Sequence, residues 1–280
     1  MAGKQPLLEK AMAPEALDAA WRKLRREHTP WSVTVSRDQL EQHLLCHILT
    51  CRQEVLQGSY RPQPMRRFAM KKTDGSDRVL SAQYLRDKLV QRALLLVLTP
   101  RAEAVFHSDS FAYRPGRNVA MALARVRERV MIGQDWLVDA DIRSFFDSIP
   151  HKQLLRVLDN FVGDRGAMRL IRQWLACGAH HSSLLARRRG IAQGAILSPL
   201  FCNLYLTDFD NRLASRNIPF VRFADDFLLF ADSRARAEKA LEFAGRALGR
   251  LGLELHPDKT GIVRSGPAVR FLGQRLPRRQ

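Results

Sequence analysis

The sequence predicts an α+β protein with a small, mostly antiparallel sheet packed on helices. Apolar residues alternate along Trp136–Ile142, which is typical of a half-buried strand. The apolar stretch Val221–Phe230 is interrupted by Asp225-Asp226, which predicts two short strands joined by a tight turn. Segments with helical spacing surround both stretches, and this order of elements predicts helices on one face of one sheet.

The amino-terminal part is predicted to be mainly helical and basic over the first 60 residues. A hairpin is then expected from Arg67–Met70 and Arg78–Leu80, because Thr73–Ser76 contains the Asp-Gly turn signal. A helix from Ala82 to Leu98 is expected to stop at Pro100, since proline has no N–H group to continue the hydrogen-bond ladder.

Further helices are indicated by apolar residues three and four positions apart. They cover Val119–Met131, His151–Phe161, Ala167–Ala176, a stretch that begins at Ser198-Pro199, and Ala237–Leu251. Two short apolar segments, Leu253–Leu255 and Val269–Leu272, remain as strand candidates.

The charge of the chain indicates a polyanionic partner. Its 46 Lys and Arg residues against 28 Asp and Glu residues give a formal net charge of +18. This exceeds what solubility requires and favours nucleic acid as the partner. The basic residues are dispersed through helical segments, which suits a long groove better than a single anion pocket.

A membrane is the competing explanation for this charge. No apolar run approaches the roughly 18–20 residues needed to span a bilayer, and the best candidate, Ala93–Leu98, is bounded by Arg92 and Arg101. The start of the chain, Met1–Pro6, lacks the apolar core of a secretory signal. We therefore expect a cytoplasmic protein without membrane contact.

The cysteines are expected to be buried thiols. They are Cys46, Cys51, Cys177 and Cys202. They form no Cys-x-x-Cys pair and have no matching histidine spacing, which argues against zinc binding and disulfides.

Adjacent carboxylates in an apolar hairpin suggest a metal site. Burying like charges costs on the order of several kcal/mol per ion, and a divalent cation is the usual neutraliser. A solvated hairpin tip is the alternative for Asp225-Asp226, because polar turns are common between strands. If the strand that ends at Asp141 lies beside this hairpin, three carboxylates meet. Such a set suits two Mg²⁺ ions, for which Mn²⁺ can substitute, and in-line phosphoryl transfer.

Several motifs follow one another along nearly the whole chain. They are Arg66-Arg67, Lys72–Arg78, Leu85–Gln91, Phe111–Arg117, Asp139–Asp147, Gln193–Pro199, Phe223–Asp226, Gly252–Thr260 and Phe271–Gly273. In this order they resemble the reverse transcriptases of the bacterial group II intron type. The resemblance implies an RNA-directed DNA polymerase with right-hand fingers and palm, and a thumb that is reduced or absent.

The resemblance implies a role for each matching residue of the palm. The catalytic, metal-binding acids would be Asp141, Asp225 and Asp226. Phe146 matches the steric gate, whose ring leaves no room for a 2′-hydroxyl, although an ordinary core phenylalanine is the alternative. Lys259 resembles the lysine that protonates the pyrophosphate leaving group, with a simple phosphate contact as the alternative. The neighbouring Asp139 and Asp147 match no catalytic position and are expected to be structural.

Other matching residues would bind the incoming nucleotide. Lys72 and Arg78 match the fingers residues that grip the triphosphate, a task that suits cationic donors, although both could be plain surface cations. Gln193 and Gly194 would contact the nucleotide and template at a place where a larger side chain would obstruct them.

The resemblance also implies a domain organisation. We expect one reverse transcriptase domain with a helical basic region over 1–60, fingers over 61–135 and a palm over 136–280, with fingers elements interleaved around 155–192. Ala195 and Phe223 depart from the usual family pattern without removing a metal ligand. Little sequence follows Phe271–Gly273, so we expect the maturase, thumb and endonuclease regions to be missing.

The expected partners are an RNA template, a DNA or RNA primer and deoxynucleoside triphosphates. A short polymerase of this type resembles the reverse transcriptases of CRISPR adaptation modules, which copy RNA for spacer acquisition beside an integrase. Two alternatives remain open. One is a catalytically idle RNA-binding subunit that acts through partners, and the other is a mobility protein derived from a group II intron.

Overall fold

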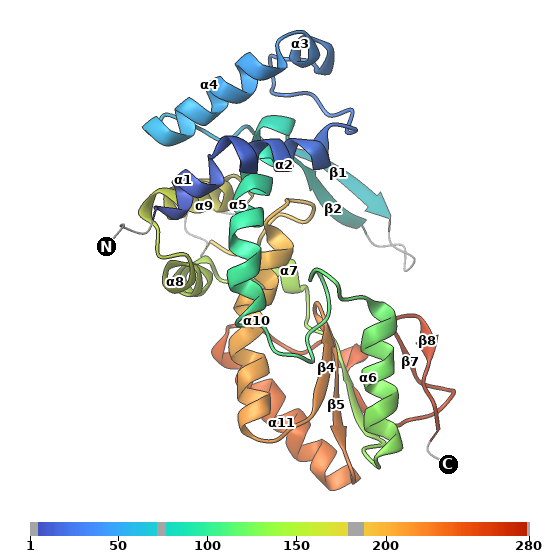
Figure 1. The fold of residues 1–280 in the computed structure, drawn as a ribbon. Coiled ribbons are helices and arrows are strands. Elements are labelled where there is room, and N and C mark those ends of the chain that lie inside the picture. Colours follow the sequence, from blue (N-terminus) through green and yellow to red (C-terminus); the bar gives the residue numbers. More distant parts are fainter. Residues whose placement is uncertain (1–4, 72–76, 179–187, 279–280) are drawn as a thin grey trace. The chain divides into compact units, whose positions relative to one another are not determined.

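The computed structural model describes residues 5–71, 77–178 and 188–278, and it confirms the α+β class (Figure 1). The chain forms two compact units. The first unit contains Met1–Ala104 and His151–Phe201, and the second contains Val105–Pro150 and Cys202–Gln280. Each unit therefore combines two stretches that are separated in the sequence.

The first unit is mainly helical. Its elements are α1 (Leu7–Ala11), α2 (Pro14–Leu24), α3 (Arg37–Gln42), α4 (Leu44–Gln57), β1 (Arg66–Lys71), β2 (Asp77–Ala82), α5 (Leu85–Glu103), α8 (His151–Val162) and α9 (Arg165–Gly178). The helix α10 (Ser198–Ser215) begins in this unit and continues in the second.

The second unit contains the main sheet. Its elements are α6 (Val119–Met131), β3 (Trp136–Ala140), α7 (Phe145–Ser148), β4 (Phe220–Phe223), β5 (Asp226–Ala231), α11 (Arg234–Arg250), the 3₁₀ turn η1 (Pro257–Lys259), β6 (Gly261–Arg264), β7 (Arg270–Phe271) and β8 (Gln274–Arg275).

A buried polar cluster joins three parts of the first unit. The Tyr60 hydroxyl donates to Oδ1 of Asp87 on α5, and the backbone N–H of Gln63 donates to Oδ2 at 2.8 Å. The indole N–H of Trp174 on α9 donates to the Tyr60 hydroxyl oxygen at 3.2 Å. Burial raises the pKa of Asp87 to about 6, although the hydrogen bonds from Tyr60 and Gln63 and the charge of Arg86 oppose the shift. Asp87, which belongs to the Leu85–Gln91 motif, therefore holds parts of the first unit together.

The helix α5 passes through Pro100, contrary to our prediction that it stops there. It continues to Glu103 with Pro100 inside it. A proline removes only one bond from the ladder, and the hydroxyl of Thr99 donates to the carbonyl of Leu95 at 2.7 Å in the same turn. Leu98 and Ala102, one turn apart on the same face, are both buried. Burial of this face keeps the chain helical past the proline.

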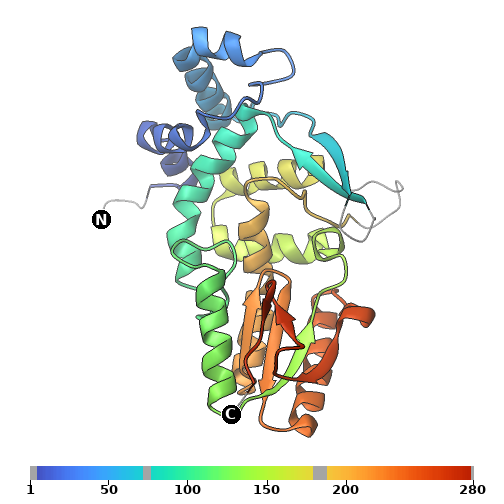
Figure 2. The same cartoon turned by 90° about the vertical axis from the view of Figure 1, so that its right-hand side faces the viewer.

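The main sheet has the strand order β4-β5-β3-β6 with antiparallel pairing throughout. Leu228 and Phe230 on β5 pack into a core with α6, whereas Phe227 packs on Phe209 of α10 with ring centroids 5.2 Å apart. Because successive strand residues face opposite sides, helices cover both faces of the sheet. Figure 2 shows the sheet between α6 and α11. Our prediction of helices on one face was wrong.

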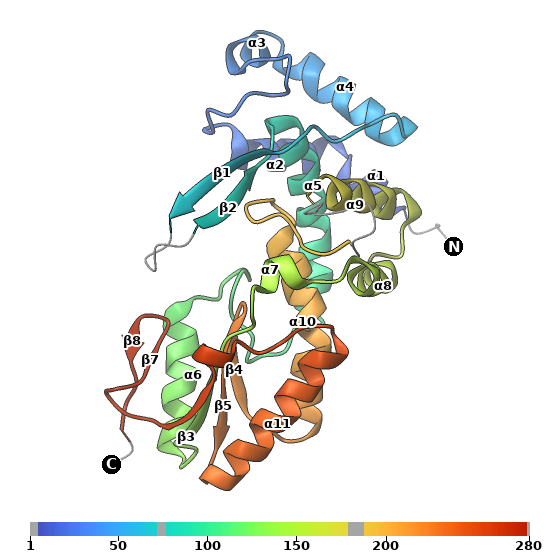
Figure 3. The same cartoon turned by 180° about the vertical axis from the view of Figure 1, so that it is seen from behind.

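The last strands also differ in part from the prediction. Leu253–Leu255 does not form a strand, and only Leu255 makes an isolated bridge, to Ile142. The edge of the sheet is instead β6, which pairs with β3. The candidate Val269–Leu272 contains β7, which pairs with β8 beside α6 (Figure 3).

The predicted hairpin of β1 and β2 is confirmed, with Met70 opposite Arg78, while its turn lies outside the described residues. The cysteines follow the prediction in part. Cys51 and Cys202 are buried, Cys177 is half-buried and Cys46 is exposed. Cys46 lies on α4, where only Cys51 and Val55 are buried, so most of this helix faces solvent.

Candidate active site

Strand pairing brings the predicted acids to one end of the main sheet. Ala140 on β3 lies opposite Phe227 on β5 in an antiparallel pair. Asp141 follows Ala140 and Asp226 precedes Phe227, so the two acids lie at the same end of the paired strands. Phe223 lies opposite Asp226 across the hairpin, which leaves Ala224 and Asp225 as the turn. Ala224 has a positive φ of 62°, the conformation that two-residue hairpin turns require at their first position.

The carboxylates of this end lie close enough to affect one another. The pKa of Asp226 is raised to about 6 by burial first and then by the charges of Asp225, Asp141 and Asp139, while Lys259 opposes the shift. Asp226 belongs to the exposed residues, yet other atoms crowd its carboxyl group. The pKa of Asp139 is also raised, by burial and by Asp141. The site therefore concentrates negative charge.

Lys259 lies at the same place. Its ammonium nitrogen contacts Oδ2 of Asp141 at 3.1 Å, and its side chain is 61% exposed. The backbone N–H of His256 donates to the carbonyl of Asp141 at 2.8 Å. The backbone N–H of Arg143 donates to the backbone carbonyl of Glu254 at 2.9 Å. The segment that ends in η1 is thus fixed against Asp141, and it brings Lys259 to the carboxylates from far along the sequence.

The donor set suits a hard divalent cation. It consists of carboxylate oxygens, which Mg²⁺ and Mn²⁺ prefer, and the raised pKa of Asp226 indicates negative charge that a cation would neutralise. In the described part of the chain, no three His, Cys, Asp or Glu side chains converge closely enough to hold a metal as they stand. The residue types fit the ion.

The two phenylalanines after Asp141 have different surroundings. Phe145 is 2% exposed, whereas Phe146 is half-buried. Their rings meet edge to face with centroids 5.6 Å apart. Both lie on the short helix α7, which follows Ser144 at a positive φ of 43°. Phe145 belongs to the core, and Phe146 keeps a surface that a ligand can contact.

Three of the predicted nucleotide-binding residues, Arg78, Gln193 and Gly194, lie in the first unit. The carbonyl of Gln193 accepts the backbone N–H of Ser81 on β2 at 2.8 Å. Gly194 has a φ of 100°, and a Cβ atom at this position would lie 2.6 Å from the carbonyl oxygen of Ser81. Arg78 belongs to β2, and Lys72 lies outside the described residues. Gly194 is therefore required by its backbone and by the approach of β2, a reason that the sequence did not reveal.

One residue of the hairpin was missed from the sequence. We predicted strands from the apolar stretch that contains Arg222 and assigned this arginine no role. It is fully buried at 0% exposed and binds the turn that carries Asp225. A charged side chain amid apolar strand residues requires a buried partner, and this signal was present in the sequence.

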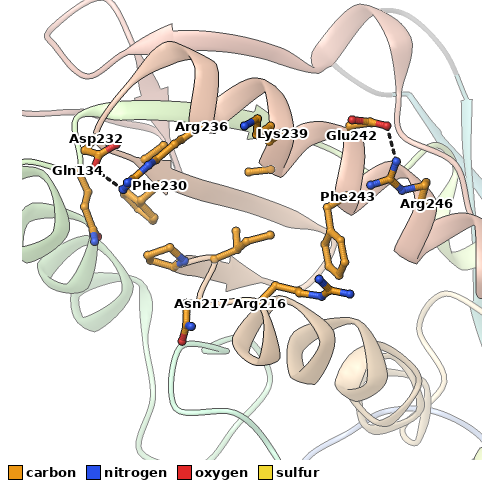
Figure 4. A pocket seen from close by; sticks show the side chains of 14 residues that line it. Gln134, Arg216, Asn217, Phe230, Asp232, Arg236, Lys239, Glu242, Phe243 and Arg246 are labelled. Atoms are coloured by element: carbon orange, nitrogen blue, oxygen red, sulfur yellow. Dashed lines mark hydrogen bonds and ion pairs between the residues drawn. The ribbon is translucent and has the colours of Figure 1, made fainter.

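A cavity of about 690 Å³ lies at the opposite end of the same hairpin (Figure 4). It is lined by Gln134, by residues 216–219 between α10 and β4, by the end of β5 and by α11. Phe230 and Phe243 contribute apolar surface, and Arg236 and Arg246 at its rim pair with Asp232 and Glu242. The cavity contains none of the predicted site residues.

Comparison with known proteins decides the family. Residues 70–276 match the family described as reverse transcriptase (RNA-dependent DNA polymerase). The chain belongs to the reverse transcriptase family. It therefore carries an RNA-dependent DNA polymerase domain, which implies an RNA template and nucleotides as its ligands.

Similar proteins come from several groups. Protein YkfC of Escherichia coli is 30% identical over 99% of this chain and 84% of its own length. The group II intron-encoded protein LtrA of Lactococcus lactis is 33% identical over 61% of this chain and only 28% of its own length. The reverse transcriptase of retron Mx65 of Myxococcus xanthus is 25% identical over 74% of this chain and 49% of its own length.

Solved structures share the fold. A chain of the Cas6-RT-Cas1–Cas2 complex aligns over 88% of this chain and 43% of its own, with a TM-score of 0.50 and 24% identity. Telomerase of Candida tropicalis aligns over 76% of this chain and 43% of its own, with a TM-score of 0.55 and 12% identity. Within the residues that the structure describes, no helix is both long and apolar enough to cross a membrane.

Proposed function

We propose that this chain is an active RNA-directed DNA polymerase whose catalytic acids are Asp141, Asp225 and Asp226. One observation carries the proposal. Asp141 comes from a distant part of the sequence, yet its charge raises the pKa of Asp226, as does the charge of the adjacent Asp225. A fold that accepts such repulsion at one end of its sheet has a use for the concentrated charge. Within this family the use is the binding of divalent metal.

The residues of the site divide the work. Asp141, Asp225 and Asp226 would hold Mg²⁺, and the ion would supply activation of the primer hydroxyl and stabilisation of charge on the leaving pyrophosphate. Asp225 and Asp226 come from the hairpin turn and the start of β5, and Asp141 directly follows β3, so both strands of the β3–β5 pair supply ligands at the same end. Lys259 keeps an ammonium proton beside Asp141, from which it can donate to a departing phosphate oxygen.

The remaining assignments concern the nucleotide. Phe146 presents a half-buried ring shortly after Asp141, which suits a gate against a 2′-hydroxyl. Gln193 and Gly194 form a loop that hydrogen-bonds to β2, the strand of Arg78. We assign Lys72, Arg78, Gln193 and Gly194 to binding of the incoming deoxynucleoside triphosphate and the template.

The test is primer extension on a heteropolymeric RNA template with Mg²⁺. We expect Asp141→Asn, Asp225→Asn and Asp226→Asn each to reduce the rate by about 1,000-fold or more, because each removes a ligand for the ions that carry the chemistry. Asp232→Asn is the matched control. Asp232 follows the other end of β5 and pairs with Arg236, so its loss should leave extension unchanged.

The same assay separates the alternatives. An idle RNA-binding subunit would bind the template without extending the primer, and the three variants would then behave like the wild-type chain. Full activity in any of the three variants would contradict the assignment of that acid. Thermal unfolding of each variant excludes a trivial loss of structure, and removal of a like charge should leave stability equal or higher.

A biological role in spacer acquisition is a second candidate. It is supported by the shared fold with a chain of the Cas6-RT-Cas1–Cas2 complex, whereas the similarity to LtrA supports descent from intron mobility proteins. The neighbouring genes distinguish the two. A gene for a CRISPR integrase next to this one, and co-purification of its product with this chain, would favour adaptation. A surrounding group II intron would favour mobility.

A further inference from the structure

Arg222 on β4 makes a buried ion pair with Asp210 on α10. The arginine is 0% exposed and the aspartate 1%. The guanidinium donates from Nε to Oδ1 at 2.8 Å and from Nη2 to Oδ2 at 2.6 Å, so the pair is bidentate. Bidentate geometry fixes the plane of the guanidinium as well as its position.

The remaining nitrogen of Arg222 points to the catalytic turn. Nη1 donates to the carbonyl oxygen of Ala224 at 2.9 Å and to Oδ1 of Asn203 at 3.1 Å. The side-chain amide of Asn203 is fixed in turn, because its Nδ2 donates to the carbonyl of Ala112 at 2.8 Å. The amide of Asn203 therefore helps to fix the direction in which Nη1 meets the carbonyl of Ala224.

The backbone of Arg222 is held as well. Its N–H donates to the carbonyl of Asp109 at 2.9 Å, and its carbonyl accepts the N–H of Phe111 at 2.9 Å. These bonds join β4 to the segment that contains Ala112. The arginine thus ties α10, the 109–112 segment and the hairpin turn together.

The bonded carbonyl belongs to a strained residue. Ala224 has a φ of 62°, and a left-handed conformation costs a residue other than glycine about 1–2 kcal/mol. Such strain persists only where the surroundings fix it, and it gathers at functional sites. The carbonyl of Ala224 lies in the same planar peptide group as the N–H of Asp225. Fixing the direction of this carbonyl therefore also fixes the backbone from which Asp225 begins.

We propose that Arg222 is a positioning residue for the polymerase reaction, and that its guanidinium sets the orientation of Asp225 through the carbonyl of Ala224. The inference rests on the proposed function, since Asp225 must be catalytic for its orientation to matter. Stability alone does not explain a buried ion pair, because apolar residues of similar volume are often as stable or more so. Apolar residues could not hold the turn.

The main test replaces the pair by apolar residues, Arg222→Met with Asp210→Leu. We expect a folded protein of equal or higher melting temperature whose kcat falls about 10- to 100-fold, the effect of a small misplacement of a catalytic group. The KM for deoxynucleotides and the affinity for template–primer should change less than about threefold. Binding of Mn²⁺ without substrate, measured by electron paramagnetic resonance, should weaken.

A second variant, Arg222→Lys, keeps the charge beside Asp210. A single ammonium group cannot make the bidentate pair and also reach Ala224 in a fixed direction, so kcat should fall here too. Arg212→Met is the matched control, because Arg212 makes an exposed ion pair with Asp208 on the same helix. Its kcat and Mn²⁺ binding should match the wild-type values.

The outcomes are distinct. If either Arg222 variant is folded and retains wild-type kcat and Mn²⁺ binding, the proposal is wrong. If Asp225→Asn retains activity, the proposed function of that acid fails instead. The two inferences are both supported if Asp225→Asn is inactive, the Arg222 variants lose kcat and Mn²⁺ affinity, and Arg212→Met does not.

Discussion

Two adjacent phenylalanines at the start of α7 have the same side chain but different exposure, and we assign them different roles. Phe145 is buried in the core, and Phe146 is half-buried beside it. From the sequence the two are equivalent by type, and only the resemblance distinguished them. In the fold, their different exposure supports different effects of the same substitution.

We predict that Phe146→Ala gains incorporation of ribonucleotides while its stability changes little. Removing the ring would open space for a 2′-hydroxyl. Phe145→Ala, the matched comparison, should lose about 3–5 kcal/mol of stability as a buried aromatic ring is removed. Primer extension with either kind of nucleotide, together with chemical denaturation, measures both effects. If the Phe146→Ala variant discriminates against ribonucleotides as strongly as the wild-type chain, Phe146 is not the gate.

The catalytic acids could be predicted because charged residues in apolar strands are conspicuous. Asp141 and Asp225-Asp226 each end or interrupt an apolar stretch, and strand pairing then brings them together. Arg222 follows the same rule but its partners could not be predicted. Asp210 and Asn203 lie on a long helix, and only the packing of that helix on β4 aligns them with the arginine.

At the scale of elements, the loop at Gly194 depends on its contact with β2. We predict that Gly194→Ala destabilises the first unit and raises the KM for deoxynucleotides. The added Cβ would meet the carbonyl of Ser81 at 2.6 Å, and the backbone has a φ of 100° that alanine rarely adopts. Thermal unfolding and steady-state kinetics measure the two effects.

Gly249→Ala is the control for this substitution. Gly249 lies within α11, where an added Cβ would meet nothing within 4 Å. Alanine should therefore stabilise the helix by about 0.5–1 kcal/mol and leave the KM unchanged. Equal effects of the two substitutions would show that the approach of Ser81 does not matter.

The polar cluster on α5 makes a prediction about pH. Because the pKa of Asp87 is raised to about 6 in the folded chain from an ordinary value of 3.8, the folded state binds more protons between these values. The contribution of Asp87 to stability is therefore fully present below about pH 4 and is lost as the pH rises through 6. The loss is on the order of 2–3 kcal/mol.

Comparison with Asp87→Asn isolates this contribution, since asparagine does not titrate. The stability of the wild-type chain relative to the variant should fall between pH 4 and pH 7 and stay level above that. Urea denaturation at each pH measures the difference. A constant difference across this range would contradict the raised pKa.

Element types were predictable where the apolar period was long, and boundaries were not. The helix Val119–Met131 agrees with its prediction at both ends. The predicted end of the helix at Pro100 was wrong. The missing N–H of proline favours the end of a helix, but burial of Leu98 and Ala102 favours its continuation to Glu103. The strand β6 was missed because its short sequence, Gly261–Arg264, has little period, and pairing with β3 alone makes it a strand.

For the whole molecule, the net charge of +18 predicts binding that depends steeply on salt. If the chain grips a template–primer duplex through 6–10 phosphates, its affinity should fall by roughly 10³–10⁵ between 50 and 200 mM salt. Fluorescence anisotropy of a labelled duplex measures this dependence, and log affinity should decrease linearly with log salt. A flat response would contradict binding through a long basic groove.

The discontinuity of the two units has a consequence for synthesis on the ribosome. The strand β3 is central in its sheet, but β5 ends at Ala231, 91 residues after β3 ends at Ala140. At a translation rate of about 5–20 residues per second, roughly 5–20 s pass between the synthesis of β3 and that of β5, and both edges of β3 are unpaired during this time. Asp141 is therefore translated well before the turn that completes its site, and a nascent chain that pauses in this interval presents an apolar strand to its neighbours.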